Sequence, residues 1–208
     1  APAVDEAAPP DSQPGQVYEL GPHRLVCGDS SDPKILATVS DGVTAIVTDP
    51  PYGIGIDGQK ASISSNPKHN RKAHEFRGWD DKRPAEEVFN IILKFAVPTV
   101  IWGGNYFADL LPATRGWIYW SKGQDGLTMS DGELAWTSMP TPLRAVTVNR
   151  GALQGSEHPT QKPVKVIEFS LEYLGASLVV LDLFGGSGTT LIAAAQTGRV
   201  ARVIELDP

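Results

Sequence analysis

Short hydrophobic runs alternate along this chain with amphipathic segments, a pattern that predicts a layered α/β domain. Apolar runs and alternating segments predict strands at 17–20, 23–28, 45–49, 99–104, 116–122, 132–138, 144–148, 177–184 and 200–205. Helical spacing predicts helices at 33–37, 84–97, about 105–111, 164–174 and 191–195. We therefore expect a three-layer, Rossmann-like sandwich with a mostly parallel sheet.

The predicted strand at 45–49 ends in residues suited to binding a ligand. It runs into Asp49-Pro50-Pro51-Tyr52, and because two prolines cannot donate ladder hydrogen bonds, the backbone must leave the sheet there. A carboxylate and a free carbonyl beside an aromatic ring suit a planar molecule that carries an amino group. The alternative is a simple Pro-Pro turn, with Asp49 as a cap and Tyr52 in the core.

A second predicted strand, 177–184, passes into the glycine-rich loop 185–190 and then into a helical segment. Glycines let the backbone approach a ligand closely, and the helix N-terminus offers free amides. Glu205, about 20 residues further on, ends the next strand, where it can accept hydrogen bonds from ribose hydroxyls. Because both motifs end strands, we expect Asp49 and Gly186 to lie at the same edge of the sheet.

Composition and length fit one globular domain. The chain has 208 residues, of which 41% are hydrophobic and 20% charged, enough for a full core. No run of about 18 apolar residues occurs and no signal-peptide pattern opens the sequence, so we expect a cytoplasmic protein without a membrane span. The single Cys27 excludes an internal disulfide and argues against a structural zinc site. Residues 1–16 have the composition of a disordered leader or linker, which leaves 17–208 as the folded domain.

Charge is distributed unevenly. A formal net charge of −6 argues against a general nucleic-acid binder. The segment 57–83, however, has a local excess of basic residues, which we interpret as an arm that grips a DNA backbone, the alternative being a solvated loop. The DNA-binding residues expected in it are Lys68, Arg71, Lys72 and Arg77.

Taken together, these motifs resemble those of the amino-methylating DNA methyltransferases. The run from Asp49 to Tyr52 matches the catalytic tetrapeptide of that family, and Phe184 to Gly188 matches its cofactor loop. The tetrapeptide precedes the loop, which is the permuted order of the β group, and the segment 101–107 is similar to a stretch in phage and prophage members. The resemblance covers the chain from about residue 17 onward and implies the fold of S-adenosylmethionine-dependent methyltransferases.

The resemblance also implies the cofactor and the residues that hold it. The Gly-Asp that ends the segment 23–29 would place Asp29 beside the adenine ring of S-adenosylmethionine, although Asp29 is also a good helix cap. The element 158–163 matches a family turn that closes over the methionine end of the cofactor. The cofactor-binding residues expected on these grounds are Asp29, His158, Thr160, Lys162, Phe184, Gly186, Gly188 and Glu205.

The activity implied is methylation of the exocyclic N6 of adenine in DNA, within a restriction-modification setting, after the base has been flipped out of the duplex. The catalytic residues would be Asp49, Pro50, Pro51 and Tyr52, with no metal. Alternatives are methylation of cytosine N4, methylation of RNA or protein amines, and a non-catalytic partner subunit. Methylation of cytosine C5 is disfavoured because there is no Pro-Cys nucleophile motif. A homodimer or a separate recognition domain would supply further DNA contacts.

Overall fold

The structure is a computed structural model that describes residues 12–55, 78, 80–123, 130–149, 161–176 and 179–208. Its strands are β1 (Val17–Leu20), β2 (His23–Cys27), β3 (Ala45–Thr48), β4 (Thr99–Trp102), β5 (Trp117–Ser121), β6 (Gly132–Thr137), β7 (Arg144–Thr147), β8 (Val179–Asp182) and β9 (Val200–Glu205). Its helices are α1 (Pro33–Ala37), α2 (Glu86–Lys94), α3 (Val164–Tyr173), α4 (Thr189–Gln196) and the short 3-10 helix η2 (Gly104–Phe107).

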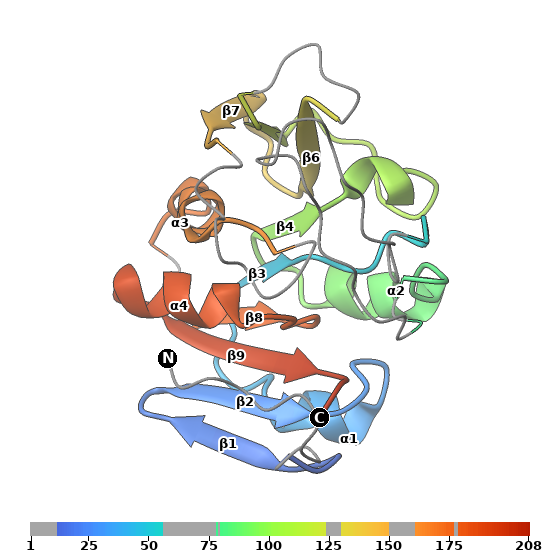
Figure 1. Cartoon of the computed structure of the whole chain (residues 1–208), viewed down its shortest axis with the longest axis vertical. Helices are drawn as coiled ribbons and strands as arrows, with labels where there is room; N and C mark the ends of the chain where they lie inside the picture. Colours follow the sequence, from blue (N-terminus) through green and yellow to red (C-terminus); the bar gives the residue numbers. More distant parts are fainter. Residues whose placement is uncertain (1–11, 56–77, 79, 124–129, 150–160, 177–178) are drawn as a thin grey trace, which may run out of the picture.

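All the described strands join one sheet, in the order β1-β2-β9-β8-β3-β4-β6-β5-β7. The strands β2, β9, β8, β3 and β4 run parallel to one another. The strands β1 and β6 pair antiparallel with their neighbours, and β7 pairs parallel with β5. The sheet is therefore mostly parallel, as predicted, and Figure 1 shows α3 and α4 on one side of it and α2 on the other.

Alternate residues of the central strands build the two cores on either side of the sheet. In β3, Ala45 and Val47 pack in the cluster that includes residues of α3 and α4, whereas Ile46 packs in the cluster that includes α2. Because side chains alternate across a strand, a strand that is buried at every position, as β3 is, must be covered on both faces. These two cores give the three layers of the predicted Rossmann-like sandwich.

Two predicted helices differ in the structure. Helix α2 ends at Lys94 rather than 97, and Ala96 has a positive φ of 51°, so the chain has already left the helix before Pro98. The helix expected at about 105–111 is instead η2, a single 3-10 turn that follows Gly103 in the left-handed region, at φ 70°. A left-handed residue directly before the turn and tight packing of Phe107, which is fully buried, favour a short turn over a regular helix.

The segment before β1 already contacts the sheet. The amide of Gly15 donates to the carbonyl of Cys27 at 2.7 Å, and the amide of Cys27 donates to the carbonyl of Gln16 at 3.0 Å. Gly15 and Gln16, which lie in the expected leader, thus bond to β2, whereas residues 1–11 lie outside the described part of the chain. None of the described helices is long and apolar enough to cross a membrane.

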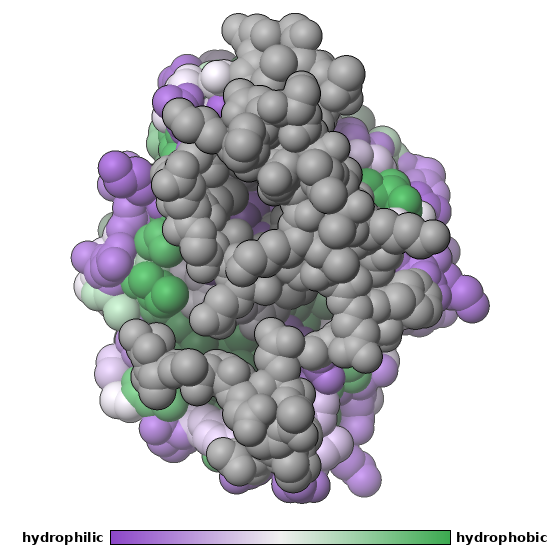
Figure 2. All heavy atoms as spheres, viewed as in Figure 1, coloured by the Kyte–Doolittle hydropathy of each residue, from purple (hydrophilic) through white to green (hydrophobic). Residues whose placement is uncertain are grey.

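On the face shown in Figure 2, hydrophilic side chains dominate the described surface along both margins, and hydrophobic ones gather in smaller groups between them. This agrees with helices that turn apolar stripes toward the sheet: Val88, Phe89 and Ile92 of α2 are buried, while Glu86 and Glu87 in its first turn are exposed.

Candidate active site

Four parallel strands end side by side at one edge of the sheet. The register pairs Cys27 of β2 with Glu205 of β9, and β3 with β8 through Ile46 and Leu181. Asp49 directly follows β3, and Gly186 follows β8, so both lie at the carboxyl edge of adjacent parallel strands. The prediction that the tetrapeptide and the glycine loop share an edge is confirmed.

Asp49 is held by two donors. The Tyr52 hydroxyl donates to Asp49 Oδ1 at 2.8 Å, and the Lys162 ammonium forms an ion pair with Oδ2. Burial raises the pKa of Asp49 from its ordinary value, against the opposing effect of the Lys162 charge. Its side chain nevertheless keeps 30% of its surface exposed, so Asp49 lies at the surface of the site rather than deep in the core.

Tyr52 belongs to an aromatic group built on η2. Its ring stacks on Tyr106, with centroids 4.7 Å apart and planes inclined by 17°, and meets the edge of Phe107. A Cβ on Gly103 would lie 2.1 Å from the Tyr52 ring, so only glycine fits there, and its φ of 70° also favours glycine. The predicted stacking face of Tyr52 is thus covered on one side by Tyr106, which is itself 38% exposed.

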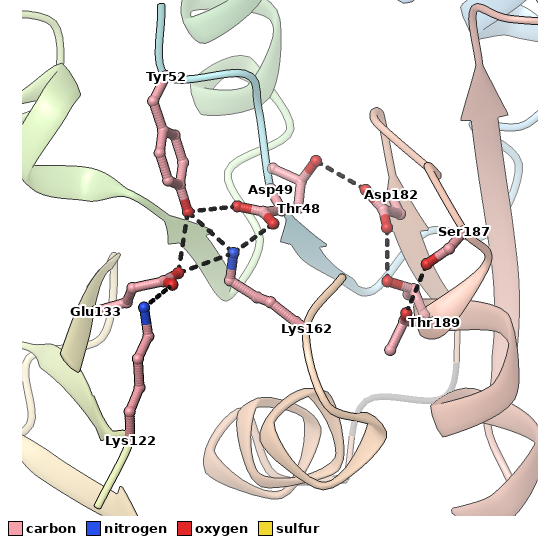
Figure 3. A network of polar contacts seen from close by, with 10 residues as sticks. Thr48, Asp49, Tyr52, Lys122, Glu133, Lys162, Asp182, Ser187 and Thr189 are labelled. Carbon is pink, nitrogen blue, oxygen red and sulfur yellow. Dashed lines mark hydrogen bonds and ion pairs between the residues drawn. The ribbon is translucent and has the colours of Figure 1, made fainter. Parts of the chain in front are cut away.

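Figure 3 shows that Asp49 and Tyr52 form one end of a larger ionic network. Lys162, whose side chain is only 4% exposed, lies between Asp49 and Glu133, and its Nζ is 3.3 Å from Glu133 Oε2. Lys122 Nζ pairs with Glu133 Oε1 at 2.7 Å. Burial raises the pKa of Glu133, but the charges of Lys162 and Lys122 outweigh it and hold this pKa at about 2. The pKa of Lys162 is raised, because its two carboxylates outweigh the effect of burial.

Sequence reasoning did not find two members of this network. Lys162 was expected among the cofactor-binding residues, and the structure brings it against the tetrapeptide. Glu133 and Lys122 were not expected at the site at all. A glutamate at the start of β6 and a lysine after β5 are ordinary in sequence, and only the antiparallel pairing of β5 with β6 places them together.

The glycine loop is held tightly against β9. The Gly185 amide donates to the carbonyl of Ile204 at 2.8 Å, and the Gly186 amide donates to Glu205 Oε2. A Cβ on Gly185 would lie 2.5 Å from Val203 Cγ1, which explains glycine at this position. Gly188, at φ 76°, then starts α4.

Asp29 lies beside this loop because β2 pairs with β9. The Gly28 amide donates to the carbonyl of Glu205 at 2.7 Å, and the exposed Asp29 accepts the Ser31 amide at 2.8 Å. The residue that caps α1 is Asp32 rather than Asp29, since the Asp32 side chain accepts the Lys34 amide at 2.8 Å. Asp29 lies in the turn before the helix, directly after the Gly28 amide that bonds to Glu205.

Asp182 connects the strand that precedes the tetrapeptide with the glycine loop. It is buried, and it accepts hydrogen bonds from Thr48 at 2.9 Å, Thr190 at 2.6 Å and the Phe184 amide at 3.1 Å. Burial raises the pKa of Asp182 to about 7. Sequence reasoning treated Asp182 only as part of a strand, yet its bonds tie β3, the glycine loop and α4 into one unit.

The chain after the tetrapeptide is fixed by Asp80. Asp80 is 1% exposed and accepts the Gly53 amide at 2.8 Å. The nearby Arg83 pairs with both oxygens of Asp109, at 2.7 and 2.9 Å, and donates to the carbonyl of Tyr106 at 2.7 Å. The described end of the basic segment 57–83 is therefore anchored beside the aromatic group.

The expected site residues that lie outside the described residues are Lys68, Arg71, Lys72, Arg77, His158 and Thr160.

Comparison with known proteins decides the family. The sequence model of the N6_N4_Mtase family, described as DNA methylase, matches residues 97–208, more than half of the chain. The chain belongs to this DNA methylase family. The resemblance to amino-methylating DNA methyltransferases is thus confirmed at the level of the family.

Individual relatives of this DNA methylase agree with the fold. The protein named "Putative methylase YubD" from Escherichia coli (strain K12) is 28% identical over an alignment of 207 residues that covers 88% of this chain and 84% of the relative. The solved M1.HpyAVI-SAM complex aligns with a TM-score of 0.53 at 20% identity, over 88% of this chain and 93% of the other. The cytosine-N4-specific PvuII DNA methyltransferase aligns with a TM-score of 0.51 at 18% identity, over 88% of this chain and 82% of the other. These likenesses confirm the predicted methyltransferase fold.

Proposed function

We propose that this DNA methylase transfers a methyl group from S-adenosylmethionine to the exocyclic N6 of adenine in DNA, as a member of the β group. The observation that carries the proposal is the partly exposed Asp49 side chain, which lies at the same sheet edge as the glycine loop of the adjacent strand. This arrangement supports a site in which an acceptor for the target amine lies next to a cradle for the methyl donor.

The residues at the edge fit the proposed cofactor. Gly186 has a φ of 49° and open space where a side chain would point, so a ligand can approach this side of the loop closely. We assign Glu205 to the ribose hydroxyls, Asp29 to the adenine amine of the cofactor, and Phe184, Gly186 and Gly188 to the loop around it. His158 and Thr160 are assigned by resemblance to the methionine end. The hydrogen bond from the Gly28 amide to the Glu205 carbonyl keeps Asp29, which follows β2, next to the end of β9.

Asp49 and the Pro50 carbonyl would accept the two N–H groups of the target amine and so free the nitrogen lone pair. The bound cofactor would supply an electrophilic sulfonium methyl group. In the transfer, the amine nitrogen would take the methyl group, the electrons of the broken C–S bond would stay on sulfur, and Asp49 would accept the proton that the nitrogen then loses. Burial raises the pKa of Asp49, which makes it a better acceptor of that proton than an ordinary aspartate.

The target base would have to leave the duplex to reach Asp49, at a cost of a few kcal/mol. Stacking on an aromatic ring returns about 1–3 kcal/mol per base, and Tyr52, which bonds to Asp49 and stacks on Tyr106, offers an aromatic ring beside Asp49. We assign DNA backbone contacts to Lys68, Arg71, Lys72 and Arg77, and any recognition domain or second copy of the chain would add to them.

Cytosine N4 is the second candidate target, favoured by the likeness to a cytosine-N4-specific structure. Adenine is preferred because aspartate rather than serine opens the tetrapeptide. The deciding experiment is incubation with labelled methyl donor and DNA, RNA or protein, followed by nucleoside analysis. We expect N6-methyladenine from DNA. Finding N4-methylcytosine instead would change the proposed target base from adenine to cytosine, and label in RNA or protein alone would overturn the proposal.

Glu205→Ala should weaken S-adenosylmethionine binding by about 10- to 100-fold, because a hydrogen bond to a charged group contributes about 1.5–3 kcal/mol. Isothermal calorimetry on the folded proteins measures this directly. Glu172→Ala, which removes an exposed acid at the far end of α3, is the matched control and should bind normally. An unchanged affinity in Glu205→Ala would remove Glu205 from the cofactor site.

A further inference from the structure

Both oxygens of the Asp49 carboxylate already have partners in this structure. Oδ1 accepts from the Tyr52 hydroxyl at 2.8 Å, and Oδ2 is paired with the Lys162 ammonium. The proposed function requires Asp49 to accept an N–H of the target amine. Each oxygen can accept more than one hydrogen bond, but the amine then competes for it with a donor that is already bound. A buried ammonium or hydroxyl that is weakened or displaced in this competition carries a desolvation penalty unless another acceptor takes it over.

Glu133 is placed to accept from both of these donors. Its Oε2 lies 3.3 Å from Lys162 Nζ and 3.4 Å from the Tyr52 hydroxyl (Figure 3). Both distances are slightly longer than a normal hydrogen bond of about 2.7–3.2 Å. A shift of a few tenths of an ångström would convert either contact into a full hydrogen bond, so no rebuilding of the site is needed.

Lys122 fixes the Glu133 carboxylate in this position. It pairs with the other oxygen, Oε1, at 2.7 Å, and it is itself only 10% exposed. The carboxylate is thereby oriented with Oε2 toward Lys162 and Tyr52. Because Lys122 and Lys162 hold the pKa of Glu133 at about 2 against the effect of burial, Glu133 is an ionised acceptor throughout the neutral range.

We propose that Glu133 is a positioning residue for methyl transfer: it takes over the Lys162 ammonium and the Tyr52 hydroxyl when the target amine engages Asp49. The inference rests on the proposed function, since it assumes that Asp49 receives the amine. It explains why one lysine is shared between two carboxylates. The exchange leaves the charge of the site unchanged, and Lys162 keeps an anionic partner at every stage.

The test is Glu133→Gln, which keeps the shape of the side chain and removes its charge. A neutral amide competes poorly for Lys162, so the ammonium stays on Asp49 and competes there with the target amine. We expect kcat for DNA methylation to fall about 10- to 100-fold, with the affinity for S-adenosylmethionine unchanged by calorimetry. Glu172→Gln is the control and should retain the kcat of the unmodified chain.

A double-mutant cycle with Tyr52→Phe separates this role from a purely structural one. Tyr52→Phe keeps the ring and frees Asp49 Oδ1, so less release is then required. Glu133→Gln should therefore cost clearly less in the Tyr52→Phe background than alone. If the losses of kcat in Glu133→Gln and Tyr52→Phe are additive in the double variant, or if Glu133→Gln alone has a normal kcat, the inference is overturned. Should Glu133→Gln not fold, Lys122→Met, which loosens the acceptor without removing it, should lower kcat several-fold, and a normal kcat would count equally against the proposal.

The two proposals fail differently. Asp49→Ala with normal methylation would refute the proposed function and this inference together. An inactive Asp49→Ala with fully active Glu133→Gln would refute the role of Glu133 alone.

Discussion

Asp49→Ala is expected to lower methyl transfer by about 10³-fold or more while changing the affinity for S-adenosylmethionine by no more than a few-fold. Asp49 would orient the amine and stabilise its developing positive charge, and removing one preorganised electrostatic partner of a transition state typically costs 10²–10³-fold. The glycine loop and Glu205 lie on other strands and keep their own contacts. Single-turnover methylation and calorimetry on the same preparation measure the two effects.

Asp49→Asn is the stricter variant, because it keeps the side-chain volume and one acceptor oxygen. It should also be severely impaired, since the amide cannot offset positive charge. In both variants Lys162 retains Glu133 as a partner, so the fold should persist, as checked by thermal unfolding. Near-normal methylation by a folded Asp49→Ala would show that the tetrapeptide is only a Pro-Pro turn.

Lys162→Met should lower the free energy of unfolding at neutral pH by about 3–5 kcal/mol, the usual cost of removing one member of a buried ion pair. The variant leaves the carboxylates of Asp49 and Glu133 close together without the cation that separates them. Lys165→Met removes an exposed lysine three residues further along the chain, in the first turn of α3, and should change stability by less than about 0.5 kcal/mol. Urea unfolding of the three proteins provides the comparison.

The effect of Lys162→Met on the free energy of unfolding should depend on pH. The pKa of Glu133 in the folded chain, about 2, is below its ordinary value of 4.5, so its contribution to stability is present above about pH 4.5 and is lost as the pH falls toward 2. Lys162→Met removes much of that contribution. The stability difference between the unmodified chain and the variant should be largest near neutral pH and should shrink at acidic pH. A difference that does not depend on pH would mean that the loss comes from packing rather than charge.

Local patterns were enough to predict most of the elements and their common edge. Continuous apolar runs such as 45–48 indicated strands covered on both faces, and the structure confirms two cores around them. The proximity of Asp49 and Gly186 was predictable because parallel strands end at one edge whatever lies between them in sequence. The end of helix α2 and the turn η2 were predicted less well. The positive φ of Ala96 shows that the chain has left α2 early, and at η2 the packing of Phe107 and the left-handed Gly103 override the helical spacing.

By itself, then, the sequence determined the α/β layers, the edge at which two strand-terminal motifs meet, and the acceptor and glycine chemistry placed there. Only the tertiary structure decided which charges face Asp49. Lys162 is 113 positions from Asp49, and Glu133 reaches the site through the pairing of β6 with β4 and β5. No local periodicity encodes such contacts, because they depend on how distant strands pair and on which side chains the core excludes from water.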